Sequence, residues 1–368
     1  MDTEVLRVSQ INLNLTKKWK YISTLPTILF CLLGLGNIFV IISHLTDDSS
    51  KKGVTRGGRQ LATSTFHSTV IIKGAVHIFT IVFVRATIFL KREQVTQFFG
   101  EFKTLVEQWS SFSSQAALSS DKTKSVGIIS TRSEGRLRVE LIILCISFII
   151  LTADMWEGYL SDRAASLTSS LVIVIPPMLG YVHAIFPFLL TFFLNWYVEI
   201  LRGLINSSNF ALVEMKIQLY HRLSDNVSSF VRLFGTCIVI DMAHSVMRIV
   251  FCAYFVASFA SEPVRNVRGM ISDVFTVVGY FYFLFMICKK GSQLEGGSGD
   301  FIKICENGFG ESEKLYGSFL FRPRHPKLRK IYLDTDYFRV NLGLITPIVG
   351  TVTTNLIVLM QFQNGDKT

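Results

Sequence analysis

Seven stretches of this sequence are apolar over about 20 residues or more, and they restrict the possible folds most strongly. A helix needs about 20 mainly apolar residues to cross the hydrocarbon core of a bilayer. Helices and closed barrels are the only structures that satisfy every backbone hydrogen bond there. The sequence therefore predicts an all-α integral membrane protein with seven transmembrane helices. The stretches cover about 24–44, 68–90, 139–160, 170–200, 231–259, 270–288 and 340–363.

Composition agrees with a single multi-pass membrane domain. Charged residues make up 17% of the chain and apolar residues 49%, whereas soluble proteins carry about 25% charged residues. The six cysteines lie mostly inside apolar stretches, which is typical of small buried side chains and not of a disulfide framework. No internal repeat occurs, so we expect one seven-helix membrane domain over residues 1–368. Pro176 and Pro177 are expected to break the fourth stretch.

Lys and Arg are distributed unevenly over the loops and predict the orientation. The side that holds residues 1–23 carries 25 of them, and the opposite side carries eight. Cytoplasmic loops carry the excess of Lys and Arg, so the N-terminus is expected in the cytoplasm and the C-terminus outside the cell. This topology is inverted relative to a G-protein-coupled receptor. The glycosylation sequons at Asn14, Asn206 and Asn226 favour the other orientation, because all three fall on the predicted cytoplasmic side.

Two of the predicted cytoplasmic loops contain amphipathic patterns. Residues 95–109 place apolar side chains at helical spacing, so the second membrane helix is expected to continue below the membrane. Residues 212–223 show a similar pattern in steps of three and four. The Ser-rich stretch from Ser110 to Ser133 is typical of disorder. Together with residues 301–330, these helical extensions are expected to form a cytoplasmic layer.

The last apolar stretch carries a line of small and polar residues that a lipid-facing helix does not need. Gly350, Thr354, Val358 and Gln361 fall on one stripe at helical spacing. Such a stripe suits close contact with another helix or a water-filled path. Of these two interpretations, the stripe alone favours close packing against another helix.

The end of this stretch resembles a known signature. Thr354, one further residue, five apolar residues and then Gln361-Phe362 resemble the Thr-Tyr, five apolar residues, Gln-Phe signature of insect and other invertebrate gustatory receptors. These are seven-transmembrane chemoreceptors related to insect odorant receptors. The whole segment GLITPIVGTVTTNLIVLMQF looks like the final helix of that family, and six residues follow it. Asn355 departs from the signature, because the family usually has Tyr there.

The resemblance implies a gustatory receptor: a ligand-gated, non-selective cation channel of the plasma membrane that detects a small-molecule tastant. Its partners would be the tastant, monovalent and divalent cations, the lipid bilayer and other gustatory receptor subunits in a homo- or hetero-tetramer. The family's seventh helix lines a central pore, and its cytoplasmic layer joins the subunits. The implied pore-lining residues are Gly350, Thr354, Ile357, Val358 and Gln361. The alternative is an inverted seven-helix receptor that signals through a partner protein and conducts no ions itself.

Ionisable residues inside the predicted spans require partners or a wet cavity, because each costs about 2.5–3.5 kcal/mol at the centre of a membrane helix. They fall on one face of the second span and one face of the fifth: Lys73, His77 and Arg85, then Asp241, His244 and Arg248. Pairing inside the bundle and a polar ligand cavity both account for them. Aromatic walls with a few polar anchors suit a small-molecule pocket. The residues expected to contact the ligand are Trp156, Tyr181, His244 and Tyr280.

Nothing in the sequence predicts an enzyme. Zinc-ligand spacings, phosphate-binding loops and nucleophile motifs do not occur, so no catalytic residue, metal or cofactor is expected. The net charge of +10 comes from basic residues scattered between the spans. This distribution favours contact with anionic lipid headgroups over nucleic-acid binding.

Overall fold

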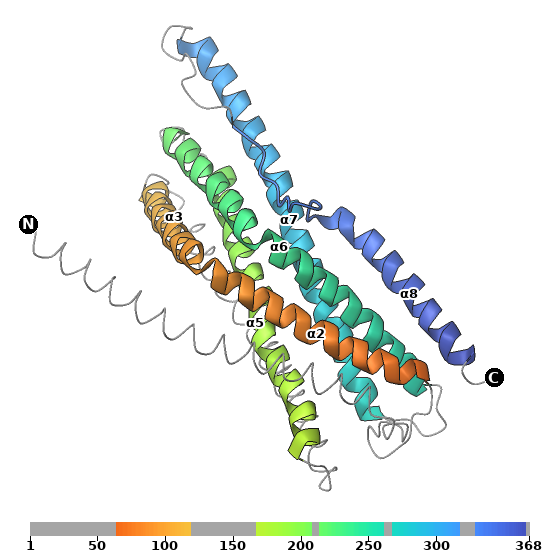
Figure 1. Ribbon diagram of the computed structural model, residues 1–368. Coiled ribbons are helices and arrows are strands. Elements are labelled where there is room, and N and C mark those ends of the chain that lie inside the picture. Colours follow the sequence, from red (N-terminus) through yellow and green to blue (C-terminus); the bar gives the residue numbers. More distant parts are fainter. Residues whose placement is uncertain (1–63, 119–166, 208–212, 261–266, 317–327, 366–368) are drawn as a thin grey trace, which may run out of the picture. The chain divides into compact units, whose positions relative to one another are not determined.

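The computed structural model describes residues 64–118, 167–207, 213–260, 267–316 and 328–365, and these residues are mainly helical (Figure 1). The elements are α2 (Ser64–Leu90), α3 (Arg92–Leu118), α5 (Leu167–Asn206), α6 (Val213–Ala260), α7 (Val267–Tyr316), the short 3-10 helix η3 (Leu342–Leu344) and α8 (Ile345–Gly365). The chain divides into two compact units. One consists of Met1–Arg92, Ala153–His183 and Phe362–Thr368, and the other of Glu93–Thr152 and Ala184–Gln361. The single domain predicted from the sequence stays a prediction.

Five of the described helices are long and apolar enough to cross a membrane. The candidate spans are Ile72–Leu90, Ile185–Asn206, Glu214–Ser258, Met270–Glu306 and Leu342–Gln363. They coincide with the second, fourth, fifth, sixth and seventh predicted stretches. The first and third stretches, about 24–44 and 139–160, lie outside the described residues. The protein is therefore an all-helical membrane protein, while the number of seven spans and the inverted topology stay predictions.

The helices α6 and α7 are much longer than a bilayer requires. They contain 48 and 50 residues, which at 1.5 Å per residue corresponds to about 70–75 Å. The hydrocarbon core is only about 30 Å thick. Both helices must therefore continue beyond the membrane, as the pattern in residues 212–223 predicted. The side on which they project stays a prediction.

Two expectations about helix boundaries are wrong. The Ser-rich stretch is helical at its start, because α3 continues to Leu118. Phe112 is buried there beside Trp109 of the same helix, with 5.7 Å between the ring centroids, so this part of α3 is packed. The break expected at Pro176 and Pro177 is also absent, since α5 is continuous from Leu167 to Asn206. Proline is tolerated within membrane helices, where neighbouring groups satisfy the freed backbone carbonyls.

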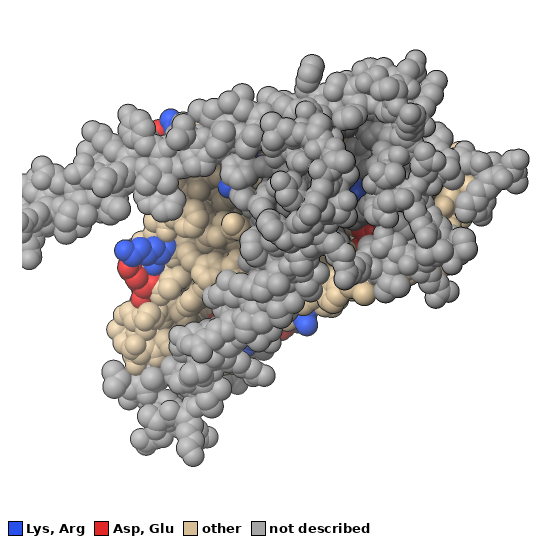
Figure 2. All heavy atoms as spheres, turned by 90° about the horizontal axis from the view of Figure 1, so that it is seen from below, with Lys and Arg blue, Asp and Glu red and all other residues tan. Residues whose placement is uncertain are grey.

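The helix α7 presents apolar side chains outward and polar ones inward. Large apolar residues are exposed along one face of it: Ile271, Val274, Phe275, Val278, Phe281 and Phe285. Ser272 and Asp273 on the same helix are buried. On the face of the molecule seen in Figure 2, the described surface is mainly uncharged, and Lys, Arg, Asp and Glu occur only in isolated places. An apolar outer surface over a polar interior is what a helix in contact with lipid requires.

The core of the larger unit is a group of aromatic rings from α3, α5 and α6. Phe193 of α5 lies at its centre, with its ring centroid 5.2 Å from that of Phe98 and 4.8 Å from that of Phe102. Phe230 of α6 is 5.8 Å away on another side. All four side chains are buried. Ring pairs at these separations add to the stabilisation that burial alone provides, so this group joins the three helices.

Two further contacts in this unit bear on the sequence analysis. A methyl group on Gly203 of α5 would lie 2.0 Å from the Trp109 ring of α3, so these two helices approach closely only because residue 203 is glycine.

The hydroxyl group of Tyr197 donates a hydrogen bond of 2.7 Å to Oδ1 of the buried Asn226. This sequon side chain is buried and bonded in the folded chain. The described cysteines Cys237, Cys252, Cys288 and Cys305 are free thiols, as expected.

Candidate functional site

The small and polar stripe of α8 is exposed. Gly350, Thr354 and Gln361 are exposed, as are Ile357 (53%) and Val358 (40%). The less exposed residues lie on the opposite face: Ile345, Ile348, Val352, Leu356 and Leu359. At about 100° per residue, the centres of these two faces are about 180° apart. The residues predicted to line a pore thus form one continuous open surface.

No other described membrane helix is as open as α8. None of its most apolar part is buried within the chain, whereas 56% of the corresponding part of α5 and of α6 is buried. Its exposed face combines apolar residues with threonines and an amide, and polar groups have no favourable partner in lipid. We therefore expect another protein chain, or water, to cover this face.

The polar side chains of α8 also bond to their own helix. The hydroxyl groups of Thr351 and Thr353 each donate to the carbonyl oxygen four residues earlier, at 2.9 Å. Nδ2 of Asn355 donates to the Thr351 carbonyl oxygen at 2.8 Å. These three donor groups therefore have acceptors within the helix, and Asn355, which stands where the signature has a tyrosine, is one of them.

The beginning of α8 lines a hollow of about 330 Å³ with α6. Its walls are Ala243, Val246 and Met247 of α6, Leu344 of η3, and Pro347, Ile348 and Thr351 of α8. The lining is almost entirely apolar, and the Thr351 hydroxyl group donates to the Pro347 carbonyl oxygen. Neither His244 nor Tyr280 is among these lining residues.

A polar group between α6 and α7 contains two of the predicted ligand contacts. His244 of α6 is buried, and its ring centroid lies 5.5 Å from that of Tyr280 of α7 at an interplanar angle of 81°. The Arg248 guanidinium group lies over the same Tyr280 ring, 5.7 Å from its centroid. The carboxylate of the buried Asp273 also acts electrostatically on Arg248. A tyrosine ring face and a nearby carboxylate stabilise a cation at membrane depth.

The structure therefore joins His244 with Tyr280 and adds two partners that were not among the expected ligand contacts, Arg248 and Asp273. Helical spacing places each of them on the same face as an expected contact, but it does not show that the two faces meet. Arg248 follows His244 by four residues on α6, and Asp273 precedes Tyr280 by seven residues on α7, so each pair shares one helix face. Tyr181 lies on the part of α5 that belongs to the other compact unit. Trp156 lies outside the described residues.

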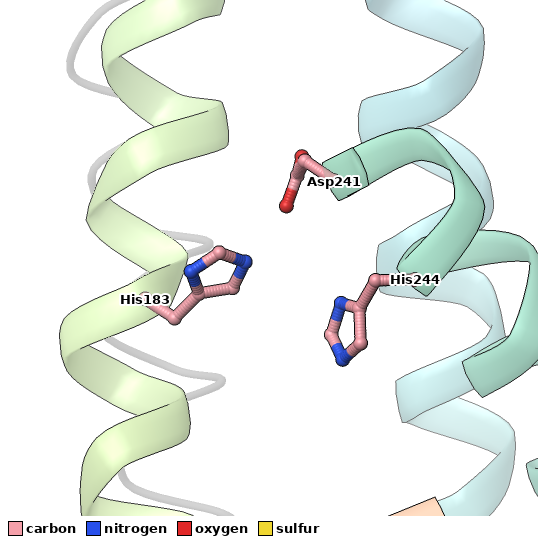
Figure 3. Close-up of side chains that lie close together, drawn as sticks. All are labelled: His183, Asp241 and His244. Atoms are coloured by element: carbon pink, nitrogen blue, oxygen red, sulfur yellow. The ribbon is translucent and has the colours of Figure 1, made fainter. Parts of the chain in front are cut away.

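Asp241 and His244 are the described groups of the larger unit that come nearest to a metal site. Both are buried and lie three residues apart on α6 (Figure 3). His183, which Figure 3 also draws, is buried on the part of α5 that belongs to the other unit. Structural zinc sites use four protein ligands and catalytic ones three. The two ligands of this unit therefore do not define a metal site by themselves.

At the level of sequence, no protein-family model matches this chain, and no curated protein matches it. The insect olfactory receptor OR5 from Machilis hrabei in complex with eugenol is similar in structure, with a TM-score of 0.62 over 91% of this chain and 88% of the receptor. A second structure of OR5 covers the same shares with a TM-score of 0.57. This chain has the fold of an insect olfactory receptor.

Sequence identity to OR5 is only 12–13%, so the similarity is one of fold. The resemblance to insect chemoreceptors is thereby confirmed at the level of architecture. These structural neighbours are receptors. The gustatory class, the ligand and the tetramer remain proposals.

Proposed function

We propose that this chain is a gustatory receptor of the plasma membrane, acting as a ligand-gated, non-selective cation channel for a small-molecule tastant. The observation that carries this proposal is α8, a membrane helix whose small and polar stripe is open along its whole length. The signature around Thr354 and Gln361-Phe362 lies on the same helix. In a pore shared between several chains, each chain contributes a membrane helix with an exposed polar face. This chain combines such a helix with a receptor fold.

Four copies of the chain around one axis would cover the open face of α8. Gly350 and Thr354 would line a wide, wet part of the path, and Ile357 and Val358 would form its narrow apolar part. Gln361 would offer its carbonyl oxygen to a partly hydrated cation near the outer end. Monovalent and divalent cations would pass through this path. The tetramer could be homomeric or include other gustatory receptors.

His244 and Tyr280 are the proposed ligand contacts that lie together in the larger unit, and a ligand role for Trp156 and Tyr181 is proposed from the sequence alone. His244 and Tyr280 already supply an aromatic ring pair beside the charged Arg248. This arrangement provides an apolar wall and polar groups that orient a ligand, which small-molecule sites generally need. OR5 has been solved in complex with eugenol, and this also supports a small molecule as the ligand here.

Cells that express only this chain should carry a cation current when an active tastant is applied. Tyr280→Ala and His244→Ala should each raise the half-maximal tastant concentration, because a ligand contact typically contributes about 1–3 kcal/mol. Whole-cell recording of concentration–response curves measures this shift. Phe275→Ala is the matched control, since Phe275 is 54% exposed on the outer face of the same helix α7.

The alternative, a receptor that signals through a partner protein, gives a different result in the same cells. The chain would then reach the cell surface and conduct nothing, although the tastant would still activate the partner's signalling pathway. Equal responses of the parent, Tyr280→Ala and His244→Ala would instead show that these residues are structural.

The proposed inverted topology places the C-terminus outside the cell. A short epitope tag after Thr368 should therefore bind antibody on intact cells as well as on permeabilised ones. A tag before Met1 should bind antibody only after permeabilisation and serves as the control. If the C-terminal tag were accessible only in permeabilised cells, both the topology and the gustatory receptor assignment would be wrong.

A further inference from the structure

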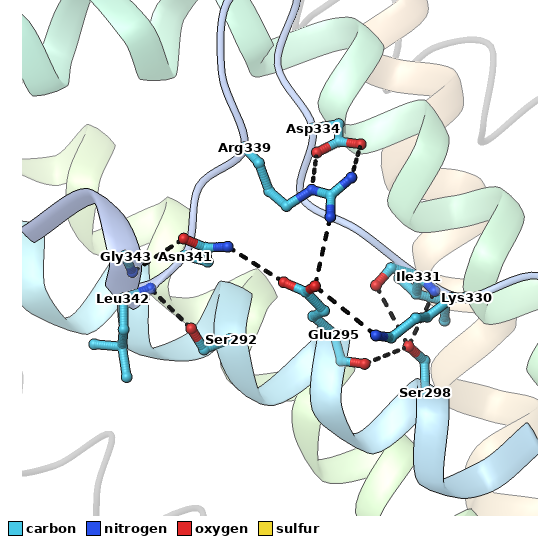
Figure 4. Close-up of polar contacts among 10 residues, drawn as sticks. All are labelled: Ser292, Glu295, Ser298, Lys330, Ile331, Asp334, Arg339, Asn341, Leu342 and Gly343. Atoms are coloured by element: carbon cyan, nitrogen blue, oxygen red, sulfur yellow. Dashed lines mark hydrogen bonds and ion pairs between the residues drawn. The ribbon is translucent and has the colours of Figure 1, made fainter. Parts of the chain in front are cut away.

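The segment that leads into α8 is bound along one strip of α7 (Figure 4). Three residues at a spacing of three, Ser292, Glu295 and Ser298, make these contacts, and we call them the clasp. The bound segment, residues 329–341, forms a turn in which the Val340 N–H donates to the Leu333 carbonyl oxygen at 2.9 Å. We call it the pre-α8 turn. All of these residues belong to the larger compact unit.

The two serines of the clasp bind backbone groups at the two ends of the turn. The Ser298 hydroxyl group accepts a hydrogen bond of 3.0 Å from the Ile331 N–H, and both residues are buried. The Ser292 hydroxyl group accepts one of 2.8 Å from the Leu342 N–H. Leu342 is the first residue of η3, which leads directly into α8. The two serines therefore attach the backbone to α7 at the start of the pre-α8 turn and directly after its end.

Glu295 binds the turn through three different side chains. Its carboxylate lies 3.8 Å from Nζ of Lys330 and 3.5 Å from a guanidinium nitrogen of Arg339, and it accepts a hydrogen bond of 3.3 Å from Asn341. Oδ1 of Asn341 caps η3 by accepting from the Gly343 N–H at 3.1 Å. One amide group thus links Glu295 to the first turn of the helical segment that contains α8.

Arg339 is held from a second side as well. Nε and Nη2 of its guanidinium group donate to both carboxylate oxygens of Asp334, at 2.7 and 3.3 Å. These hydrogen bonds raise the pKa of Arg339 above its ordinary value, so the group stays charged. Exposed ion pairs contribute little to stability, because water and salt screen them. The clasp therefore relies on its hydrogen bonds to the backbone and on close packing.

The closest packing occurs at Gly291, next to the clasp. A methyl group there would lie 2.0 Å from the Val340 carbonyl oxygen and 3.0 Å from the carbonyl carbon. These are backbone atoms of a fully buried residue, so no flexible side chain can move aside. Gly296, five residues further along α7, has no atom within 4 Å of the corresponding position.

We propose that the clasp is a positioning site that couples α7 to α8, so that a displacement of α7 moves the start of α8. This inference rests on the proposed function, in which α7 carries the ligand contact Tyr280 and α8 lines the conduction path. Tyr280 and Gly291 lie on the same continuous helix. The clasp is the contact through which ligand binding at α7 reaches the path along α8.

Gly291→Ala and Gly296→Ala test this inference as a matched pair, because both replace a helical glycine of α7 by alanine. Gly291→Ala should displace the turn, so that trypsin cleaves the purified full-length protein after Lys330 and Arg339 several-fold faster. It should also shift the half-maximal tastant concentration by about 2- to 30-fold, the range found for residues that couple two sites. Gly296→Ala should equal the parent in both measurements.

Parent-like cleavage of Gly291→Ala would overturn the clasp as the contact that holds α8. Faster cleavage with an unchanged tastant response would overturn the coupling and leave a structural contact. If no variant conducts, the parent included, the proposed function fails separately, and the trypsin comparison still decides whether the clasp holds α8. Glu295→Ala against Asp300→Ala, an exposed acidic residue of the same helix, repeats the comparison if Gly291→Ala does not reach the membrane.

Discussion

Phe193→Ala should destabilise the protein by about 3–5 kcal/mol, the usual cost of removing a buried phenylalanine ring. Phe193 is 1% exposed and contacts Phe98 and Phe102 of α3 and Phe230 of α6. Its removal leaves a cavity where three helices meet. The expected result is a large fall in the temperature at which the detergent-solubilised protein loses its monodisperse peak in size-exclusion chromatography.

Phe275→Ala is the control for this prediction. It makes the same chemical change on α7, at a residue whose side chain is 54% exposed, and should change the unfolding temperature little. Phe193→Leu should fall between the parent and Phe193→Ala, because leucine fills part of the cavity. Equal losses for Phe193→Ala and Phe275→Ala would mean that the aromatic group does not form the core of the larger unit.

The sequence predicts the membrane helices well because each depends mainly on its own composition. A run of about 20 apolar residues must form a helix in the bilayer whatever its neighbours are, and five of the seven stretches coincide with described helices. The expectation of disorder was wrong for residues 110–118, and residues 119–133 lie outside the described part of the chain. Composition alone does not reveal that Phe112 is buried within this part of α3.

The candidate sites also differ in how far the sequence could predict them. The stripe of α8 could be predicted because all its members lie on one helix, where spacing alone determines the face. The contact of Arg248 with Tyr280 joins residues of two helices, and helical spacing does not predict which helices become neighbours. The clasp was not predicted at all. Its serines bind backbone N–H groups of Ile331 and Leu342, and backbone groups are the same in every sequence.

Gln361→Glu should change ion permeation strongly. Gln361 is exposed on the open face of α8, about one turn beyond Val358. In a tetramer, the substitution would place four carboxylates around the outer end of the path, and such rings favour cations, divalent cations above all. We expect a several-fold increase in the permeability of calcium relative to sodium, measured from reversal potentials in cells that express the chain. Gln361→Ala should remove the carbonyl ligand and alter the single-channel conductance.

Phe362→Ala separates permeation from packing, because Phe362 adjoins Gln361 in the sequence and points about 100° away from it around the helix. Phe362 is 63% exposed within the single chain, so in the proposed tetramer it would contact a neighbouring chain. Its removal should reduce the probability of opening and leave reversal potentials at the parent value. Gln361→Ala is the closest match to it, since both variants truncate a side chain in the same turn of α8. If Gln361→Glu channels had the reversal potentials and conductance of the parent, the stripe from Gly350 to Gln361 would be a packing surface. The conduction path would then lie elsewhere in the protein.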